Sequence, residues 1–499
     1  MASAVLGNPF TSKSPFTGIS KACNSLADTY TDSVFFPSSA VYEDIRQDYW
    51  SNSSILSPAC IFTPASAKEV SAAVKTFRRF NAPFAVRGQG GMPITGYANI
   101  NSTGALISLN KIKAVSISDD KSMVSIGAGN DWDAVYGFLQ PYNLTTVGAR
   151  LGLVGVSGHV LGGGMTFMSN ELGFSSTSVV EYECILADGS IVIATQTSYP
   201  DLYWSLKSGG NSFALVTTFR MLTYPTGTIY AGVGTYTGTQ RAAWITSVYS
   251  QAVHGDADTR GGVEATATWN PAANPDFSYT SYLFYGGDDS TPDVLQNWTG
   301  GALLEPTNGA NPLQRTTVFD FSRSLYGGVP VNLGSRTRFS VVSVKAVSRD
   351  ALQLVHDDLF AAARSRLTGL AGISVGLVAL PVGRRFVEAS KANGGNPMGL
   401  DAAEGPFIWC IQTYNWLEAK DDVVIDEFSK TWGEQIAAQL EAKGWKDEFV
   451  YLNDADRWQN VFASFGADNL QKMKNIRHQY DPDMVFTRLM PGGWKVAHA

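Results

Sequence analysis

The 499-residue chain has little charge: only 16% of its residues are Asp, Glu, Lys or Arg, against about 25% in typical globular proteins. Acidic residues outnumber basic ones by 44 to 37, so the net charge is −7, and no basic run occurs along the chain. Nucleic acids and acidic membrane surfaces are usually bound through clustered Lys and Arg. The composition therefore argues against both of these partners and favours a small-molecule ligand.

Long apolar runs are also lacking. The longest uncharged stretch, Leu367–Gly383, is interrupted by Gly369, Gly372 and Gly376 and alternates like a strand, so it does not predict a membrane span. Residues Met1–Lys13 contain no charged segment followed by an apolar core, so no signal peptide is visible. We expect a soluble protein that binds no membrane.

Histidine and cysteine are scarce, with five and four copies. The histidines are not spaced like metal ligands, so no metal site is predicted. Cys184 and Cys410 lie in apolar strand patterns and are expected to be buried, inert thiols. Cys23 and Cys60 lie in polar, turn-rich surroundings; a disulfide between them is compatible with an oxidising compartment, but the sequence leaves the pairing open.

Apolar residues and glycine are plentiful. The chain is 44% hydrophobic, with 12 Trp and 49 Gly, and its length exceeds the roughly 250–300 residues that one core usually serves. Segment Ser66–Glu69 has the sequence of a capping box at the start of an amphipathic helix, and Asp188-Gly189 predicts a hairpin turn. Beyond about residue 226, strand patterns precede two long helices, Arg349–Arg366 and Asp421–Lys443, which indicates a second domain.

Two glycine clusters stand out, Arg87-Gly-Gln-Gly-Gly-Met92 after a predicted strand and Gly155-Val-Ser-Gly-His-Val-Leu-Gly-Gly-Gly164. Glycine lets the backbone turn sharply and bring N–H groups against an anion, as phosphate binding requires. Neither cluster has the Rossmann or Walker spacing. Each alone is as consistent with a structural turn as with a cofactor loop.

The order of the motifs is more specific. The two clusters are followed by Leu186-Ala-Asp-Gly-Ser190, Pro200–Lys207 and Gly209-Gly-Asn-Ser-Phe213, and the tail contains Tyr451-Leu-Asn453, Tyr480-Asp-Pro482 and Phe486. This series resembles the vanillyl-alcohol-oxidase superfamily, and more closely the fungal berberine-bridge-enzyme-like oxidoreductases. The resemblance covers the whole chain apart from its middle.

The resemblance implies an α+β protein with a two-part PCMH-type FAD-binding domain and a substrate domain built on an antiparallel sheet covered by helices. The expected segments are an N-terminal segment 1–54, the FAD-binding domain 55–226, the substrate domain 227–445 and a C-terminal segment 446–499 that returns to the FAD-binding domain. Fungal proteins of this type carry a cysteine pair similar to Cys23 and Cys60, which implies a disulfide and a secreted or secretory-pathway protein.

The resemblance also implies FAD, with its pyrophosphate over both glycine clusters, its adenine and ribose near Val216 and its isoalloxazine near Asn453. The residues that it assigns to the cofactor are Arg87, Gly88, Gln89, Gly90, Gly91, Met92, Val154, Gly155, Ser157, Gly158, His159, Gly162, Gly163, Val216 and Asn453. His159 has two interpretations, a hydrogen bond within the loop or proton transfer.

Two departures from the family pattern concern the flavin bond. Gly91 stands where the family has the His that bonds covalently to the flavin, and Leu151 stands where bicovalent members have a Cys. Neither residue offers a nucleophile, so FAD is expected to be bound non-covalently.

A third departure concerns catalysis. In carbohydrate-oxidising relatives a Tyr that follows the tail Asn serves as the base, and here that residue is Asp454, which makes a sugar substrate less expected. Asp454 is either an acid or base itself or a solvated turn residue. Tyr414 and Gln412 are placed by the resemblance on the substrate sheet facing the flavin, with simple burial in that sheet as the alternative.

These observations predict an FAD-dependent oxidoreductase that acts on a small, largely apolar metabolite in fungal secondary metabolism. Oxygen is the expected acceptor, because Val154 occupies the position at which relatives with a small residue react with O2. The main alternative is a redox-neutral isomerase or cyclase on the same scaffold, and a non-catalytic binding protein is a third.

Overall fold

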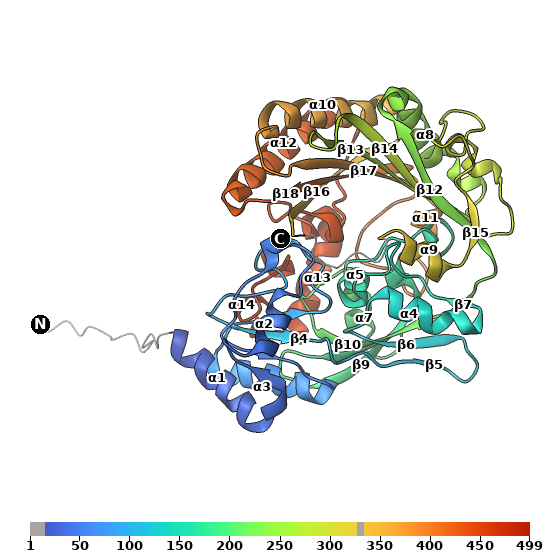
Figure 1. The fold of residues 1–499 in the computed structure, drawn as a ribbon. Helices are drawn as coiled ribbons and strands as arrows, with labels where there is room; N and C mark the ends of the chain where they lie inside the picture. The colour runs from blue at the N-terminus through green and yellow to red at the C-terminus, as the bar shows by residue number, and fades with distance from the viewer. Residues whose placement is uncertain (1–14, 327–333) are drawn as a thin grey trace, which may run out of the picture.

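The computed structural model describes residues 15–326 and 334–499. The residues that bear on a signal peptide, Met1–Lys13, lie outside this range. The described chain forms two lobes, one above the other in Figure 1, with the first half of the chain below and most of the second half above. The division follows from the sheets, because no strand of one lobe pairs with a described strand of the other.

The lower lobe contains two larger sheets (Figure 1). The first has the order β1-β2-β4-β3, with strands Val34–Phe35, Ile61–Phe62, Ala105–Ser108 and Phe84–Arg87. The second has the order β5-β6-β10-β8-β9, with strands Val115–Ile117, Met123–Gly127, Leu215–Leu222, Val179–Ile185 and Ile191–Thr195. A short ladder joins β7 (Leu144–Thr145) to β11 (Tyr224–Pro225). The first half of the chain contributes to this lobe the helices α1 (Pro15–Thr29), α2 (Ala40–Gln47), α3 (Ala67–Phe80), α4 (Trp132–Leu139), α5 (Val156–Leu161), α6 (Ser169–Leu172) and α7 (Pro200–Leu206).

Helix α3 begins as the sequence predicts. The Ser66 side chain accepts a hydrogen bond from the Glu69 backbone N–H, and the Glu69 carboxylate accepts one from the Ala65 N–H. These bonds satisfy donors that a helix start otherwise leaves without partners. The apolar side chains at helical spacing, Val70 and Phe77 among them, are fully buried. The predicted capping box is confirmed.

The predicted hairpin is also present. Strands β8 and β9 pair antiparallel on either side of Asp188-Gly189. Gly189 has a φ of +82°, a conformation that glycine adopts without steric cost. The Asp188 carboxylate accepts a hydrogen bond of 2.7 Å from the Ser190 N–H. The turn is therefore specified by these residues themselves.

The upper lobe is one eight-stranded antiparallel sheet. Its order is β15-β12-β14-β13-β17-β18-β16-β19, with strands Gln314–Thr316, Ile229–Thr237, Asn274–Tyr285, Gly261–Asn270, Ser374–Val382, Phe407–Trp416, Arg336–Lys345 and Lys446–Asp447. Helices α8 (Arg241–His254), α10 (Arg349–Leu367) and α12 (Asp422–Ala442) cover its outer face (Figure 1). Helices α9 (Val318–Ser324) and α11 (Arg384–Ala389) lie toward the lower lobe. The expected α+β architecture is confirmed.

Alternation along these strands divides the side chains between two cores. In β18, for example, Ile408 and Cys410 pack in the core beneath the helices, whereas Trp409 and Ile411 join the core of the lower lobe. The inner face of the sheet therefore rests partly on the lower lobe. The space between the lobes is where a shared site can form.

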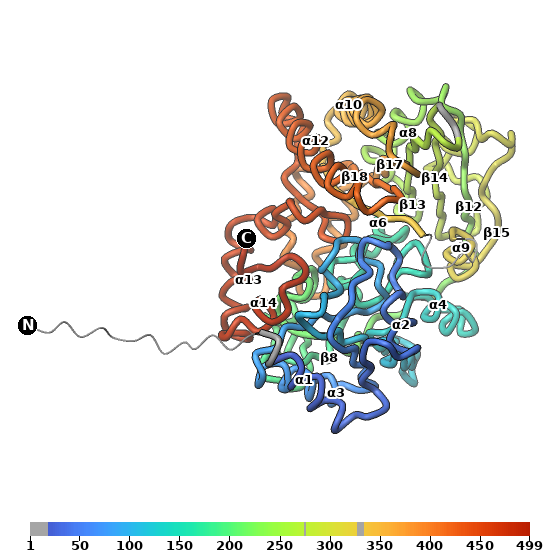
Figure 2. Tube along the Cα trace, turned by 60° about the vertical axis from the view of Figure 1, so that its left-hand side comes forward, coloured from blue at the N-terminus to red at the C-terminus, as the bar shows by residue number. Residues whose placement is uncertain are grey.

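The last fifty or so residues return to the lower lobe, where Figures 1 and 2 both show helices α13 (Ala467–Tyr480) and α14 (Val485–Arg488). The Asp481 carboxylate accepts hydrogen bonds from the N–H groups of Val485 and Phe486, at 2.7 and 2.8 Å. The Phe84 N–H in β3 donates to the Leu489 carbonyl at 2.7 Å. The C-terminal segment is thus attached to the strand that leads into the first glycine cluster.

Cys23 and Cys60 form a disulfide that ties α1 to the residue preceding β2. Cys184 and Cys410 are free and buried, as expected. In the described ranges, no helix has the length and apolar character needed to cross a membrane. Among the same residues, no group of three or more His, Cys, Asp or Glu side chains could hold a metal ion.

Candidate active site

The two glycine clusters, which the sequence presents as separate motifs, pack against each other. A Cβ added to Gly88 would lie 2.3 Å from Ser157 Oγ, and one added to Gly155 would lie 2.8 Å from the Gln89 Cβ. Both distances are shorter than real Cβ contacts, so a side chain at either position would displace the residue opposite it. The loop Arg87–Met92 and the segment Gly155–Gly164 therefore form one continuous surface, which we call the glycine cradle.

Other glycines of the cradle face open space. A Cβ at Gly91 or at Gly158 would meet no protein atom within 4 Å, and both residues are exposed. Gly90 has a φ of +76°, and a Cβ added to it would lie 2.7 Å from the Asp48 carbonyl oxygen. The cradle is thus tight toward the protein and open on its other side, which leaves its backbone accessible to a ligand.

Arg87 anchors the base of the cradle. Its side chain is completely buried and donates hydrogen bonds to the carbonyls of Ile45 and Asp48, at 2.6 and 3.0 Å, and to Ser108 Oγ at 3.1 Å. The guanidinium also lies over the Tyr49 ring. These bonds occupy the two terminal nitrogens of the guanidinium, and the sequence-based assignment of Arg87 to the cofactor stays a prediction.

The rest of the first loop is held by neighbouring side chains. Ser54 Oγ donates to the Met92 carbonyl at 2.7 Å, and the Gln89 amide donates to the Asp131 carboxylate at 3.1 Å. Asp131 is also the N-cap of α4. The loop beyond Arg87 is therefore held by side-chain hydrogen bonds to two different segments.

Asn453, from the C-terminal segment, sits against the second half of the cradle. Its Nδ2 donates to the His159 carbonyl and to the Tyr451 hydroxyl, both at 3.0 Å. The Tyr451 hydroxyl also accepts from the Met165 N–H at 2.8 Å. A Cβ at Gly162 would lie 1.9 Å from Asn453 Oδ1. The structure thus brings Asn453 to the cradle, where the order of the motifs predicts it.

His159 belongs to the second half of the cradle, and its side chain packs against other residues of the protein. Its Nε2 is 2.9 Å from Ser175 Oγ, and its ring meets the edge of Trp132. Burial, helped by the positive charge of Arg150, lowers the pKa of His159 to about 3. The imidazole is therefore neutral at physiological pH, which favours the hydrogen-bonding interpretation over proton transfer.

Asp454 follows Asn453 in a short 3₁₀ turn, Leu452–Asp454. Burial raises the pKa of Asp454 to about 7, while the charge of Arg150 acts to lower it and the charge of Glu264 acts to raise it. Arg150 and Glu264 themselves form an ion pair of 2.8 Å. Glu264 belongs to β13 of the upper sheet and Arg150 to the loop before α5. The carboxyl that can exchange a proton near neutral pH therefore lies where the two lobes meet.

Arg150 and Glu264 were not predicted from the sequence, although a signal was present. Arg150 is the one charged residue between Asp133 and Glu171, and Glu264 is the one charged residue between Arg260 and Asp276. A single charge in a long uncharged stretch is seldom fully buried without a partner. Nothing in the sequence showed that these two charges are each other's partner.

The prediction that Tyr414 and Gln412 face the flavin is wrong. Tyr414 is fully buried beneath the helices, with its ring against Phe428 of α12 at a centroid distance of 5.7 Å. Gln412 is equally buried, accepting from Ser340 Oγ at 2.9 Å and donating to the Cys410 carbonyl at 2.7 Å. Even-numbered residues of β18 point to the helices and odd-numbered ones to the lower lobe, so the prediction was out of phase by one residue.

The remaining assigned residues are placed as follows. Val154 is partly buried, and its carbonyl accepts from the Trp132 N–H at the start of α4. Val216 is buried in β10 opposite Cys184. Gly163 has a φ of +101° and packs near Phe174. These contacts show their positions around the cradle but do not test their roles toward a cofactor.

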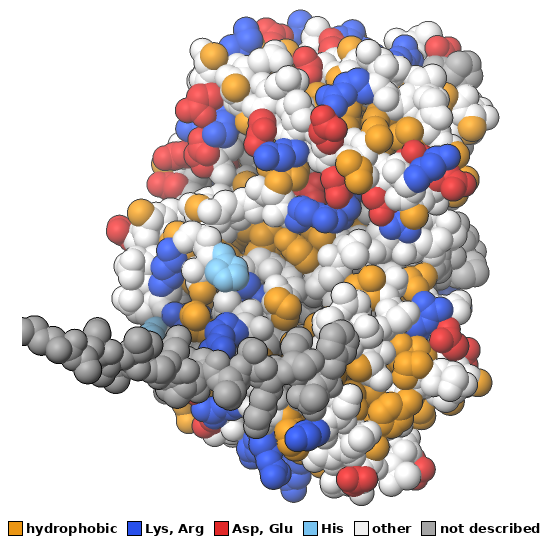
Figure 3. Space-filling model, turned by 90° about the vertical axis from the view of Figure 1, so that its left-hand side faces the viewer, with side chains coloured by type: hydrophobic (Ala, Val, Ile, Leu, Met, Phe, Trp, Pro, Cys, Tyr) orange, Lys and Arg blue, Asp and Glu red, His pale blue; other side chains and the backbone are white. Residues whose placement is uncertain are grey.

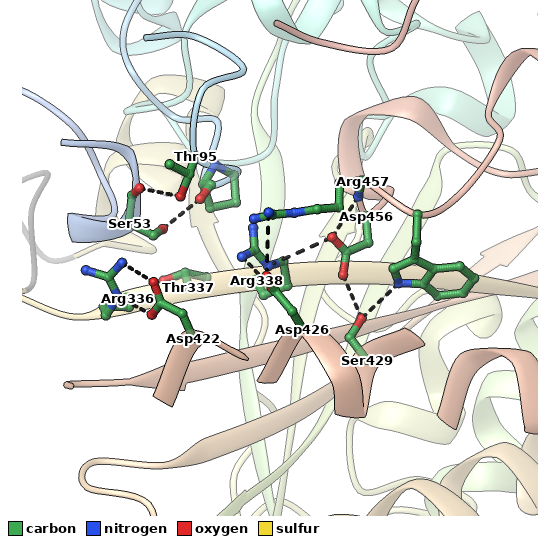
Figure 4. A network of polar contacts seen from close by, with 12 residues as sticks. Ser53, Thr95, Arg336, Thr337, Arg338, Asp422, Asp426, Ser429, Asp456 and Arg457 are labelled. Carbon is green, nitrogen blue, oxygen red and sulfur yellow. Dashed lines mark hydrogen bonds and ion pairs between the residues drawn. The ribbon is translucent and has the colours of Figure 1, made fainter. Parts of the chain in front are cut away.

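The segment after Asp454 is fixed by a polar network (Figure 4). The buried Arg338 of β16 forms ion pairs with Asp426 of α12 and Asp456, at 2.6 and 3.8 Å. Ser429 Oγ, also on α12, donates to Asp456 Oδ2 at 2.7 Å. Asn453 and Asp454 are thus held by the lower lobe on one side and by the upper lobe on the other.

Figure 3 shows the surface hollowed between the two lobes, with hydrophobic side chains in the hollow. On the inner face of the upper sheet, Phe339, Val378 and Thr413 are partly exposed. Tyr451 stacks on Trp409 of the same sheet at 5.4 Å. A ligand placed here would meet mainly apolar and hydroxyl groups.

Comparisons with known proteins agree with this geometry. A family model described as FAD binding domain matches residues 58–195. The FAD-dependent monooxygenase prx3 of Penicillium roqueforti is 34% identical over 489 residues, which cover 96% of this chain and 94% of that protein. BBE-like 1 of Physcomitrella patens has the same fold, with a TM-score of 0.77, 16% identity and coverage of 96% and 100%. Glucooligosaccharide oxidase of Acremonium strictum follows with a TM-score of 0.76, 20% identity and coverage of 93% and 97%.

Proposed function

The chain belongs to the berberine-bridge-enzyme-like FAD-linked oxidoreductases, and from that premise we propose that it oxidises a small, largely apolar metabolite in fungal secondary metabolism, with O2 as the final acceptor. The observation that carries this proposal is the position of Asp454. It is a carboxyl with a pKa of about 7, next to Asn453 on the glycine cradle and at the boundary of the two lobes.

The cradle fits FAD. Backbone N–H groups in glycine-rich turns suit a pyrophosphate, and the open sides of Gly91 and Gly158 leave room for one. In this assignment the loops Arg87–Met92 and Gly155–Gly164 hold the pyrophosphate, the adenine and ribose lie toward Val216, and the isoalloxazine lies beside Asn453. Bound FAD supplies the hydride acceptor that side chains lack.

We propose that the cofactor is bound without a covalent link. Neither Gly91 nor Leu151 offers a nucleophile, whereas the glucooligosaccharide oxidase of Acremonium strictum has a novel flavinylation. Acid precipitation should therefore release all the yellow colour into the supernatant. Flavin that stays with the washed pellet would contradict this assignment.

Asp454 supplies the proton transfer. When an alcohol is oxidised, the carbon loses a hydride and the hydroxyl loses a proton, and the carboxylate of Asp454 takes that proton. With a pKa of about 7, this carboxyl is roughly half ionised at neutral pH, so it can both take a proton and release it to solvent. Asn453 positions the neighbouring backbone through its bonds to His159 and Tyr451.

Several features support an apolar substrate and oxygen as the acceptor. The hollow between the lobes contains hydrophobic side chains (Figure 3). The charge of Arg150 is neutralised by Glu264. A strongly charged substrate would therefore find no unpaired opposite charge in these two features. Val154 is small and lies at the cradle, which supports access for O2. The relative from Penicillium roqueforti is itself named a monooxygenase, so a reaction with O2 is consistent with the family.

The test is Asp454→Asn, which keeps the shape of the side chain but cannot take a proton. We expect turnover to fall by about 10²–10⁴-fold, the usual contribution of one positioned acid or base, while FAD content and thermal stability stay unchanged. Anaerobic bleaching of the flavin by substrate should slow in parallel. Unchanged turnover in this variant would show that Asp454 is not the base.

A second candidate rests on the same carboxyl. A group with a pKa of about 7 is also suited to donate a proton, as a redox-neutral isomerase or cyclase requires. If the wild-type enzyme forms product anaerobically while the flavin never bleaches, and Asp454→Asn abolishes product, this alternative replaces the oxidation.

We also propose that the protein is made in the secretory pathway. The Cys23–Cys60 disulfide is a bond that persists in oxidising compartments and is rare in the cytosol. Fractionation of a producing culture should find the protein in the medium or in secretory vesicles. Both thiols free in the native protein would contradict this localisation.

A further inference from the structure

Four segments have the Asn-x-Ser/Thr sequence at which an oligosaccharide is attached to asparagine in the secretory pathway. They begin at Asn52, Asn101, Asn143 and Asn297. In that reaction the Asn Nδ2 bonds to the anomeric carbon of a sugar carried on a lipid diphosphate. The bond between this carbon and the diphosphate oxygen breaks, its electron pair leaves with the lipid diphosphate, and the amide loses one proton. The folded protein tolerates the product only where Nδ2 has room for a sugar.

Asn101 lies in an exposed turn between β3 and β4. Its Oδ1 accepts hydrogen bonds from the Thr103 N–H at 3.0 Å and from Thr103 Oγ1 at 2.6 Å. Both residues are exposed, and Asn101 Nδ2 makes no hydrogen bond to any residue in the described ranges. The turn therefore fixes the amide through its oxygen and leaves its nitrogen able to carry a substituent. The hydroxyl that the attachment sequence requires lies beside the same amide.

Asn143 follows the 3₁₀ turn η3 (Gln140–Tyr142) and has a φ of +55°, a conformation in which asparagine is enriched. Its backbone N–H donates to the Gln140 carbonyl, and its carbonyl accepts from the Thr226 N–H, both at 3.0 Å. The residue is exposed, and its side chain makes no hydrogen bond to the part of the chain that the structure describes. A sugar on this side chain would therefore displace no contact of the fold.

Asn52 has the opposite environment, because it joins the two lobes. Its Nδ2 donates to the Gly334 carbonyl at 2.9 Å, and its backbone N–H donates to the Ser335 carbonyl at 2.9 Å. The preceding residue continues this contact, since Ser51 Oγ accepts from the Thr337 N–H of β16 at 2.9 Å. A sugar on Asn52 would have to pass where the upper lobe meets this segment.

Asn297 is packed against α8. Its Nδ2 donates to Ser250 Oγ at 3.2 Å, and its carbonyl accepts from the Leu304 N–H at 3.1 Å. The next residue, Trp298, is fully buried. A sugar here would separate the 3₁₀ turn η7 (Asp293–Trp298) from the helix that it covers.

We propose that Asn101 and Asn143 carry N-linked glycans in the native protein and that Asn52 and Asn297 carry none. The inference is independent of the proposed oxidation and rests on the proposed secretory-pathway location. Oligosaccharide is transferred as the chain enters that pathway, before it folds, so the fold selects which glycosylated chains reach the native state. Sugars on the two exposed amides remain in solvent, whereas those on the other two oppose closure of the lobes or packing of α8.

The experiment maps the full-length protein isolated from a producing culture. Enzymatic removal of the glycans in heavy-oxygen water converts each glycosylated Asn to a labelled Asp, and peptide mass spectrometry then reads all four positions. We expect the label at Asn101 and Asn143 only. Thr103→Ala should lose one glycan in gel mobility although Asn101 is retained, and Thr103→Ser should keep it. Asn297→Gln is the matched control and should leave the mobility unchanged.

Two results would overturn the proposal. One is label at Asn52 or Asn297 in folded protein, and the other is a lack of label at Asn101 or Asn143 in protein whose disulfide has formed. The wild-type map needs no variant, so a variant that fails to fold leaves the test intact. Protein with free thiols and no glycan would overturn both this proposal and the secretory-pathway location. Substrate turnover is measured separately, so the proposed oxidation stands or fails on its own.

Discussion

Replacing Gly162 by Ala should separate the C-terminal segment from the glycine cradle. The new Cβ would lie 1.9 Å from Asn453 Oδ1, far inside van der Waals contact, so the Asn453 side chain has to move. It would then lose its two hydrogen bonds, to the His159 carbonyl and the Tyr451 hydroxyl. At about 0.5–1.5 kcal/mol for each bond, the free energy of unfolding should fall by about 1–3 kcal/mol.

Gly158→Ala is the matched comparison, because it adds the same methyl group within α5, the short helix for which Gly162 is the C-cap. At this position the Cβ meets no protein atom within 4 Å, and Ala is favoured over Gly in a helix by up to about 1 kcal/mol. The flavin-free protein should therefore be as stable as wild type or slightly more so. If the open side of the cradle is where FAD lies, the methyl group should instead weaken FAD binding at least tenfold.

The assay measures thermal unfolding of the flavin-free proteins and titration of each with FAD. We expect Gly162→Ala to lose stability without FAD, and Gly158→Ala to lose FAD affinity without losing stability. Equal stability for Gly162→Ala and wild type would refute the packing argument for Asn453. Normal FAD affinity in Gly158→Ala would show that the open side of the cradle does not hold the cofactor.

Three further predictions concern the cradle and the lower lobe. Gly91→His should fold normally, because its Cβ has open space, and mass spectrometry of the denatured protein should reveal flavin attached to it; the absence of any attachment would place the flavin ring elsewhere. Replacing Cys23 and Cys60 by Ser should lower the free energy of unfolding by about 3–4 kcal/mol, because the bond closes a sequence separation of 37 residues, and chemical denaturation would detect the change. Because the pKa of His159 falls to about 3 on folding, the unfolded chain binds the extra proton between pH 6.5 and 3, so stability should decrease as the pH is lowered through this window; His159→Gln should flatten that dependence.

Local features of the fold could be predicted because they depend on neighbouring residues. The capping box at Ser66 and the turn at Asp188-Gly189 each contain their own hydrogen-bond partners. The orientation of Tyr414 and Gln412 could not be predicted in the same way. Both faces of β18 are buried, so the strand shows no contrast between polar and apolar residues that would reveal which face points to the lower lobe.

The site itself was only partly accessible from the sequence. The order of the motifs predicted that both glycine clusters and Asn453 surround one cofactor. The contact between Gly88 and Ser157 depends on the tertiary fold, and the sequence does not reveal it. The pairing of Arg150 with Glu264 likewise depends on how one lobe closes over the other. Charge pairing between distant segments has no periodicity, and for that reason a single sequence does not disclose it.

The location of Asn453 and Asp454 in the C-terminal segment has a consequence for biosynthesis. Both lobes are made before this segment leaves the ribosome, because proteins are synthesised from the N-terminus. Until then Gly162 has no Asn453 to pack against, Arg338 lacks Asp456, and β3 lacks its bond to Leu489. A nascent chain, or one that ends about fifty residues early, therefore has glycine loops without the contacts that hold Asn453 against them.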